Sequence, residues 1–405
     1  MHASSYAECI VTQVAEGRTT RHRDEAAYYR RDRTTWAAFA ALFAFGFLNA
    51  VLGPALPYIR NVEHISYLVG ALHQVAFAVG GGLAGLLAAR ERRGSGRSPV
   101  IAAGIAGAAL AGLALGYGDA LAITLAAAFV MSLLGTSALI RVWAVLADAH
   151  GPRRAVAMTE GEVSVSLAGI LTPALIGALA ATAPGWRSAF VLGAVVAGLA
   201  AVWIRRVPIP AAGPAPAPAA GPARRGPAAT LVVVFGIVAL EFSLSFWLAS
   251  YLHDDIGLAR NAAVAAVSGL YAANLAGRLL ASRLARRVSA ERLLAVALGT
   301  ALLGLPVLLT ATGAAAAMIG AAVAGTGIGA MFPLTSALHV KASPRGADGA
   351  LGQVLTVAAI GQIAGPLTAG ALAQATGLRT GLIVLPVLTV IAVAGLYRHH
   401  TAGRP

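Results

Sequence analysis

The stretch VPIPAAGPAPAPAAGPARRGPA, residues 207–228, divides this chain of 405 residues near its middle. Its proline- and alanine-rich composition cannot bury a core and favours an extended, linker-like backbone. Apolar segments long enough to cross a membrane lie on both sides, six before it and six after it. We therefore interpret residues 207–228 as a linker between an N-terminal bundle, 35–206, and a C-terminal bundle, 229–398.

Composition indicates the class of protein. The chain is 58% hydrophobic and 11% charged, whereas soluble domains carry roughly 25% charged residues. Since a membrane-crossing helix needs about 20 mainly apolar residues, we predict an all-α integral membrane protein with twelve transmembrane helices. The predicted spans are 35–57, 65–89, 98–117, 119–146, 155–183, 186–204, 229–252, 262–288, 293–312, 314–340, 349–375 and 378–397. Residues 1–34 and 399–405 are predicted to be tails, the first of them flexible.

The basic residues test this count independently. The formal net charge is +14, and short cytoplasmic loops of membrane proteins are enriched in Lys and Arg. If the N-terminus is cytoplasmic and the sides alternate, most of the 30 basic residues fall inside, and the outer side receives only Arg60, Arg187, Arg260 and Arg379. The charge therefore reflects topology, with both termini cytoplasmic in a plasma membrane, and a nucleic-acid partner is not expected.

The two halves also repeat a sequence pattern. PALIGALA at 173–180 in the fifth span corresponds to PLTAGALA at 366–373 in the eleventh, and the separation is close to half the chain. Arg187-Ser188 and Arg379-Thr380 follow at similar distances. A transporter built from two six-helix repeats carries such a pattern, with its substrate site between the halves near the middle of the membrane.

Several motifs give the chain its family resemblance. GPALP at 53–57 closes the first span, and GWRSAF at 185–190 opens the sixth. Between spans two and three, Gly85, Arg90 and Arg93 fit a loop motif of Gly, Asp and basic residues, although Ala89 stands in place of the Asp. The second-half copy contains Arg283 and Arg287 and again lacks the Asp.

From residue 35 to about 400 the sequence resembles the major facilitator superfamily of secondary transporters. The resemblance implies two pseudo-symmetric six-helix bundles that rock about a central cavity by alternating access. It also implies that the two basic loops act in gating. The absent Asp argues against the family's charge latch at these loops, although not against the fold.

Glu241 is the clearest ionisable side chain inside a predicted span. It lies about twelve residues into span seven, near the midplane. An ionisable group there costs about 2.5–3.5 kcal/mol on insertion scales, so the presence of Glu241 indicates a structural or functional role. One interpretation is a proton-coupling carboxyl. The other is a structural Glu bonded to Arg278 or Asn274 on span eight.

Arg141, Glu160 and Glu162 form a second charged group. All three lie a short way from the cytoplasmic ends of the antiparallel spans four and five, so they are expected to meet. With Arg278 they would form an intramembrane charge network. A structural or gating role is favoured over substrate binding.

Six further side chains are candidates for the lining of a substrate cavity. Each of them alone is also explained by a hydrogen bond between helices, and His73 could instead carry a proton. The candidates are Asn49, His73, Gln74, Trp247, Asn274 and Gln362.

The predicted function is secondary active transport of a small organic molecule, not enzymatic catalysis. No ATP-binding loop of the GxxxxGK type appears in the sequence, so an ion gradient, with protons as the partner, would drive it. We favour efflux of a drug-like compound or metabolite by proton antiport. The alternatives are proton-linked import of a sugar or other polar nutrient, and a receptor or scaffold that does not transport. No cofactor or metal is expected, and the protein is expected to be a monomer in the lipid bilayer.

Overall fold

The computed structural model describes residues 30–90, 97–209, 227–285, 287–343 and 346–402. The regular elements within these ranges are all helical, and twelve helices are long and apolar enough to cross a membrane. The predicted all-α class and the predicted number of spans are therefore confirmed. Residues 1–29 of the N-terminal tail and most of the linker lie outside the described residues.

The helices of the first half follow the predicted order. They are α2 (Arg33–Ala50) and α3 (Leu52–Glu63), which together form span one, then α4 (Tyr67–Arg90), α5 (Arg97–Tyr117), α6 (Leu121–His150), α7 (Arg154–Ala180) and α8 (Ser188–Arg206). A short 3-10 turn, Gly151–Arg153, joins α6 to α7.

The second half repeats this arrangement. It contains α9 (Pro227–Asp254), α10 (Arg260–Leu284), α11 (Ala290–Thr310), α12 (Ala314–Ala342), α13 (Gly346–Thr376), the short α14 (Leu378–Gly381) and α15 (Val384–Ala402). The last helix continues to Ala402, beyond the predicted end of span twelve at residue 397. The predicted C-terminal tail is therefore largely helical within the described residues.

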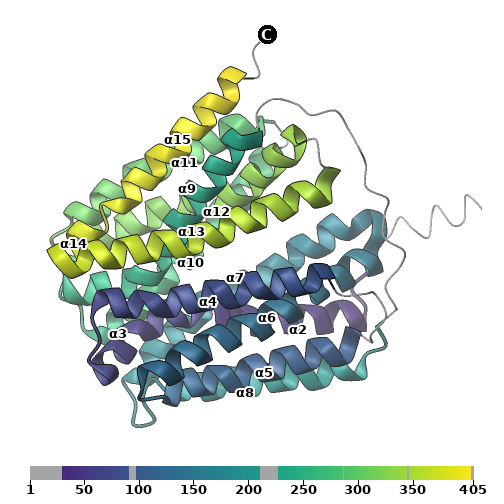
Figure 1. Ribbon diagram of the computed structural model, residues 1–405, viewed down its shortest axis with the longest axis horizontal. Coiled ribbons are helices and arrows are strands. Elements are labelled where there is room, and N and C mark those ends of the chain that lie inside the picture. Colours follow the sequence, from purple (N-terminus) through teal and green to yellow (C-terminus); the bar gives the residue numbers. More distant parts are fainter. Residues whose placement is uncertain (1–29, 91–96, 210–226, 286, 344–345, 403–405) are drawn as a thin grey trace, which may run out of the picture.

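The two halves lie side by side with their helices roughly aligned (Figure 1). Helix α4 packs against α13 and α7 against α10, so these two pairs join the halves. We call the end where α2 begins and α15 ends the terminal end, and the opposite end the far end. In the predicted orientation the terminal end is cytoplasmic.

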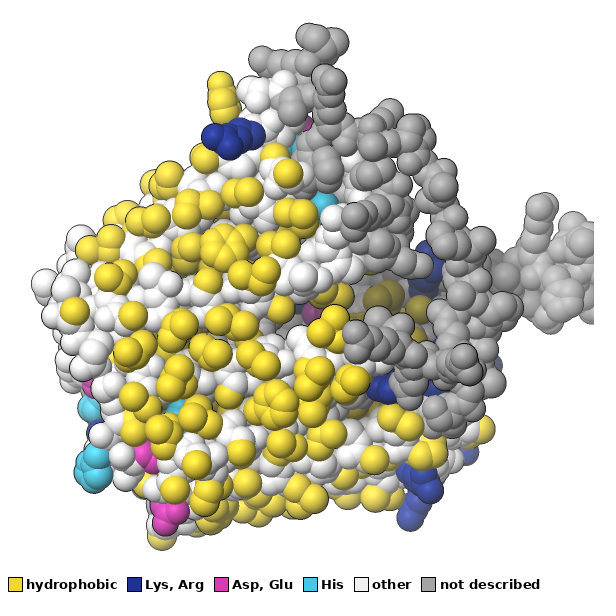
Figure 2. Space-filling view, viewed as in Figure 1, with side chains coloured by type: hydrophobic (Ala, Val, Ile, Leu, Met, Phe, Trp, Pro, Cys, Tyr) yellow, Lys and Arg dark blue, Asp and Glu magenta, His cyan; other side chains and the backbone are white. Residues whose placement is uncertain are grey.

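Large apolar side chains cover the outside of the bundle (Figure 2). Leu110, Leu199 and Leu303 each expose two thirds or more of their surface. Most of the Lys and Arg side chains visible in this view lie toward the terminal end. An apolar belt with charge gathered at one end is what a protein solvated by lipid requires.

The repeated sequence pattern has a structural explanation. Gly177 of α7 lies so close to α10 that an added Cβ would meet the Asn261 carbonyl oxygen at 2.5 Å. Gly370, at the matching position of α13, would place a Cβ 2.9 Å from the Trp247 ring and 3.0 Å from Ala71 of α4. Both glycines allow helices of opposite halves to approach closely. The repeat thus marks the contacts that close the far end.

Candidate functional site: a cavity between the halves

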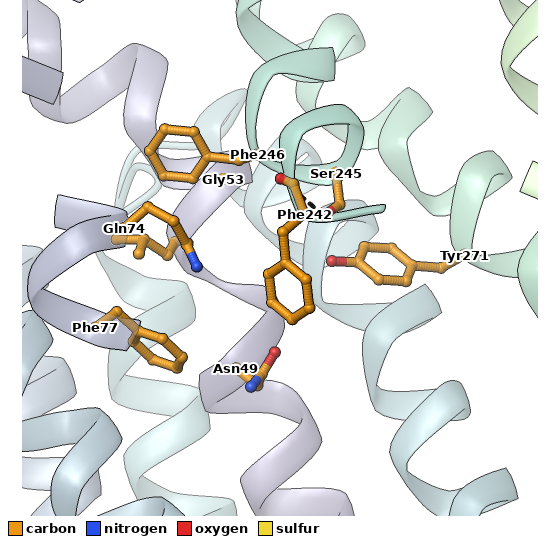
Figure 3. Close-up of a pocket in the computed structure, with 9 residues that line it drawn as sticks. Asn49, Gly53, Gln74, Phe77, Phe242, Ser245, Phe246 and Tyr271 are labelled. Carbon is orange, nitrogen blue, oxygen red and sulfur yellow. Dashed lines mark hydrogen bonds between the residues drawn. The ribbon is translucent and has the colours of Figure 1, made fainter. Parts of the chain in front are cut away.

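A cavity lies where span one, α4, α9 and α10 meet. The space among its lining residues is about 290 Å³ when the part open to solvent is included, and about 20 Å³ of it can hold the centre of a water molecule. Its lining comes from both halves (Figure 3) and consists of Asn49, Leu52, Gly53, Gln74, Phe77, Phe242, Ser245, Phe246 and Tyr271. A pocket between two six-helix bundles is the position expected for a substrate site.

Helical periodicity explains why these residues share the cavity. Residues three and four apart lie on one face of a helix, and Phe242, Ser245 and Phe246 have this spacing on α9. The three cavity residues of span one have it too. The aromatic face beside Glu241 is not evident from the order of residues along the chain, but projection of α9 as a helix reveals it.

Polar and apolar groups share the lining of the cavity. The amide of Gln74 points into it (Figure 3), and its Nε2 is buried without a hydrogen-bond partner among the described residues. Asn49 lies at its edge, and the Tyr271 hydroxyl points toward Ser245. Three phenylalanine rings supply most of the remaining wall. Such a lining suits a ligand that combines apolar and polar atoms.

Charged groups lie on the terminal side of this cavity. Glu162 of α7 accepts a hydrogen bond from Arg278 Nη1 of α10 at 3.0 Å, and this ion pair joins the two halves. Arg278 Nε also donates to the Gly329 carbonyl of α12, at 3.3 Å. Glu241 is one helical turn from Ser245 and lies within electrostatic range of both Arg278 and Glu162.

The charged group expected on spans four and five is arranged differently. Glu160 accepts two hydrogen bonds from Arg31, at 2.8 and 2.7 Å. Arg141 donates to the carbonyl of Ser137, one turn earlier in its own helix. The structure therefore places Glu162 with Arg278 and Glu160 with Arg31. Arg31 is not expected in this group because it belongs to the predicted tail, residues 1–34.

Four of the expected cavity residues lie elsewhere. His73 is fully buried and faces Thr124 of α6, 2.9 Å away. Trp247 is fully buried, and its Nε1 donates to the Pro366 carbonyl of α13. Asn274, in the amide orientation that satisfies its neighbours, donates to Gly325 of α12 at 2.8 Å. Gln362 is half-buried on α13 and is not among the lining residues. Asn49 and Gln74 are the two candidates that line the cavity.

The residues of the two expected gating loops lie at the terminal end. Gly85 is exposed near the end of α4, and α4 ends at Arg90. Arg283 and Arg287 are exposed at and after the end of α10. Arg93 lies outside the described residues.

Contacts between the halves close the far end. Arg60 Nη1 lies 3.2 Å from Asp254 Oδ2, and the Tyr67 hydroxyl donates to the same oxygen at 2.8 Å. Arg260 of the second half donates to Asn61 of the first at 3.4 Å. Each arginine predicted for the outer side also lies over an aromatic ring, from 3.8 to 5.8 Å from its centroid, and one of these contacts, Arg260 over Tyr58, joins the halves. These contacts separate the cavity from the far end.

Comparisons with known proteins agree with this architecture. Residues 38–359 match a family model described as the Major Facilitator Superfamily. No curated protein sequence matches the chain. The described fold is similar to several solved transporters, however.

One of these is a crystal structure of a bacterial homologue of the human lysosomal transporter Spinster, inward-facing and unoccupied. Its TM-score is 0.75 at 16% identity, with 92% of this chain and 98% of that chain covered. A mutant of the nucleoside transporter NupG gives 0.74 at 11% identity, with 92% and 100% covered. A D-xylose–proton symporter gives 0.69 at 14% identity, with 90% and 97% covered.

At these identities the structural likeness establishes the fold, and the family model covers well over half of the chain. Two six-helix halves around a shared cavity fit the same assignment. The chain belongs to the Major Facilitator Superfamily, and it is a membrane transporter of small molecules that works by alternating access.

Proposed function

We propose that this transporter exports a mainly apolar, drug-like compound or metabolite in exchange for protons, and that Glu241 is the proton-coupling carboxyl. The observation that carries this proposal is the imbalance of charge beside the cavity. Two carboxylates, Glu241 and Glu162, share the field of one guanidinium, that of Arg278.

Arg278 already donates a hydrogen bond of 3.0 Å to Glu162. No described residue hydrogen-bonds the carboxylate of Glu241. A carboxylate without a partner in a membrane interior is costly, so Glu241 requires either a proton or a positively charged ligand. A site that accepts one or the other, but not both together, couples substrate and proton movement in opposite directions.

The chemistry of the cavity supports an amphipathic substrate. Phe77, Phe242 and Phe246 offer aromatic faces, which attract both apolar groups and cations. Glu241 precedes Phe242 directly and lies five residues before Phe246 on the same helix. A lipophilic cation would therefore place its apolar body in the cavity and its charge near the carboxylate.

One observation favours a second candidate, proton-linked import of a polar nutrient. Gln74 Nε2 is buried without a partner among the described residues, and a buried donor in that state costs about 1–3 kcal/mol unless a ligand satisfies it. A hydroxyl-bearing substrate would do so. Two of the structurally similar proteins carry a nucleoside and D-xylose according to their descriptions.

The test is transport by purified protein in proteoliposomes that contain a pH-sensitive dye. Ethidium serves as a lipophilic cation, and D-xylose and uridine serve as polar compounds. We expect ethidium to drive proton movement in the opposite direction, and Glu241→Gln to abolish that coupling. Glu291→Gln is the matched control, since Glu291 lies at the start of α11 beside His399 and His400, away from the cavity.

The sign of the proton flux separates the candidates. Proton movement in the same direction as xylose or uridine, lost in Gln74→Leu, would replace export by import. If Glu241→Gln exchanged ethidium with the pH dependence of the wild type, Glu241 would not be the coupling group.

A further inference from the structure

A chain of hydrogen bonds joins three helices in the first half, away from the central cavity. Glu63 is the last residue of α3, and its Oε1 lies 2.7 Å from Thr124 Oγ1 on α6. The same hydroxyl oxygen lies 2.9 Å from His73 Nε2 on α4. His73 Nδ1 lies 3.2 Å from the Gly70 carbonyl oxygen. His73 and Thr124 are both fully buried.

The supply of hydrogen atoms limits how this chain can be arranged. A backbone carbonyl only accepts, so His73 Nδ1 must carry a hydrogen. Thr124 has one hydroxyl hydrogen. If it donates to an ionised Glu63, then His73 Nε2 must donate to Thr124, and His73 is an imidazolium. If it donates to Nε2, then Glu63 must be protonated and donate to Thr124.

Both arrangements make all three hydrogen bonds and hold the same number of protons. They differ only in whether Glu63 and His73 are an ion pair or two neutral groups. We propose that Glu63, Thr124 and His73 form a proton-binding relay in the first half, which is loaded from the far end and holds one proton shared between the carboxyl and the imidazole.

The transfer is balanced within the three residues. As the Glu63 carboxyl loses its proton to Thr124 Oγ1, the hydrogen already on that oxygen passes to His73 Nε2. The O–H bond of Glu63 breaks, one O–H bond forms and another breaks at Thr124 Oγ1, and an N–H bond forms at the imidazole. The net charge of the relay stays zero throughout, which suits a site inside a membrane protein.

The relay can also take up a second proton. Thr124 Oγ1 lies 3.2 Å from the Leu121 carbonyl oxygen in its own helix. When Glu63 and His73 are both protonated, they can both donate to Thr124 while its hydroxyl turns to Leu121. The relay then carries one positive charge.

Glu63 connects this buried site to the far end. It is half-buried, its Oε2 has no hydrogen-bond partner among the described residues, and the next residue, His64, is exposed. The titratable and charged groups nearest the relay in the sequence are Arg60, His64 and Tyr67, of which Arg60 and Tyr67 bind Asp254 of the other half, while α13 offers none at this end. Asp119 is exposed and acts electrostatically on Glu63.

The relay does not depend on the role proposed for Glu241. That carboxyl lies on α9 of the other half, beside the central cavity. Protons would bind to the relay and to Glu241 independently, unless the rocking of the halves links the two sites. A measurement of protonation at His73, made without any transport, therefore tests the relay alone.

The experiment is a pH titration by nitrogen NMR of protein labelled with ¹⁵N-histidine in lipid nanodiscs. The His73 signals are assigned by their loss in His73→Gln. We expect Nδ1 to be protonated throughout. We also expect Glu63→Gln to move the His73 midpoint to lower pH by about one unit or more, and this shift to fall by at least half when Thr124→Val removes the hydroxyl.

Two controls separate a relay from general electrostatics. Thr124→Ser keeps a hydroxyl and should retain the dependence on Glu63. Asp119→Asn removes a nearby charge and should leave that dependence unchanged. A neutral His73 with hydrogen only on Nε2 would overturn the proposal. So would a Glu63→Gln shift of equal size with and without the Thr124 hydroxyl.

Discussion

Single side chains decide where the first span begins. Asp32 accepts hydrogen bonds from the backbone nitrogen and the hydroxyl of Thr35, at 2.8 and 2.7 Å, and so caps α2. Thr35 in turn lies 2.8 Å from His150 Nε2 at the end of α6. Partial burial works to raise the pKa of Asp32, but the hydrogen bonds from Thr35 and the charge of His150 outweigh it, and the pKa is lowered.

This lowered pKa gives a prediction with a definite sign. A carboxyl whose pKa is lower in the folded state stabilises the fold above its unfolded pKa, and this contribution disappears as the pH falls through the folded pKa. Asp32→Ala should cost about 1 kcal/mol at pH 7. The cost should shrink below pH 4, as followed by thermal unfolding in detergent.

Asp32→Asn is the matched control because it keeps the cap and removes the charge. It should lose little at pH 7 and should be insensitive to the same drop in pH. An Asp32→Ala penalty that grows as the medium becomes more acidic would contradict this account.

At the scale of helices, glycine sets how closely the halves approach. Gly177 and Gly370 occupy matching positions of the sequence repeat, and each faces a helix of the other half. Replacing either with Ala inserts a methyl group where backbone or ring atoms already lie. Overlaps of this kind cost about 1–3 kcal/mol. The part of this cost that arises from the other half, at Asn261 for Gly177 and at Ala71 for Gly370, applies only while the far end is closed.

We therefore expect Gly177→Ala and Gly370→Ala to shift the protein toward a state open at the far end, by roughly tenfold in population. The measurement is the distance between spin labels at His64→Cys and Ala314→Cys, in a background with the single native cysteine, Cys9, replaced. Gly198→Ala is the control, because an added Cβ there meets nothing within 4 Å. Distance distributions unchanged from the parent would show that these glycines do not set the closure.

At the scale of the whole molecule, polar contacts between the halves add to this closure. The Asp254 carboxylate binds both Arg60 and Tyr67 of the first half. Nearby, burial raises the pKa of Asp255, although a hydrogen bond from the Arg379 backbone and the charge of its guanidinium oppose the shift. Partly exposed ion pairs contribute about 0.2–1 kcal/mol each, so these contacts can be broken during a transport cycle.

Asp254→Asn should accordingly increase the far-end-open population by only about two- to fivefold, less than either glycine substitution. The same label pair measures it. Asp148→Asn breaks an ion pair with Arg97 inside one half and provides a control. An increase as large as that of Gly177→Ala would mean that charge, not packing, holds the far end closed.

The sequence alone predicted the membrane class, the number of spans and the two-half plan. Span length and arginine placement are local properties of the chain, so they are evident from the amino-acid sequence alone. The contacts between polar side chains were predicted less well than this architecture. Glu162 finds Arg278 across the interface, and Glu160 finds Arg31 before the first span. Such pairings depend on helix rotation and on contacts between distant segments, which composition does not encode.

His73 shows the same limit within a single helix. It follows the periodicity of α4 but turns to α6, whereas its neighbour Gln74 turns to the cavity. One residue along a helix rotates the side chain by about 100°. Adjacent polar residues therefore face different neighbours, and only the packing of α4 between α6 and α13 decides which of them lines the cavity.

Gly53 has a mechanical consequence. An added Cβ there would meet the Ser245 carbonyl oxygen at 2.7 Å and Phe246 Cα at 2.9 Å, so span one and α9 touch main chain to main chain beside the cavity. Because no flexible side chain lies between them, span one and α9 cannot slide past each other there without losing this contact. The contact can therefore act as a pivot, about which the two halves separate at one end as they approach at the other.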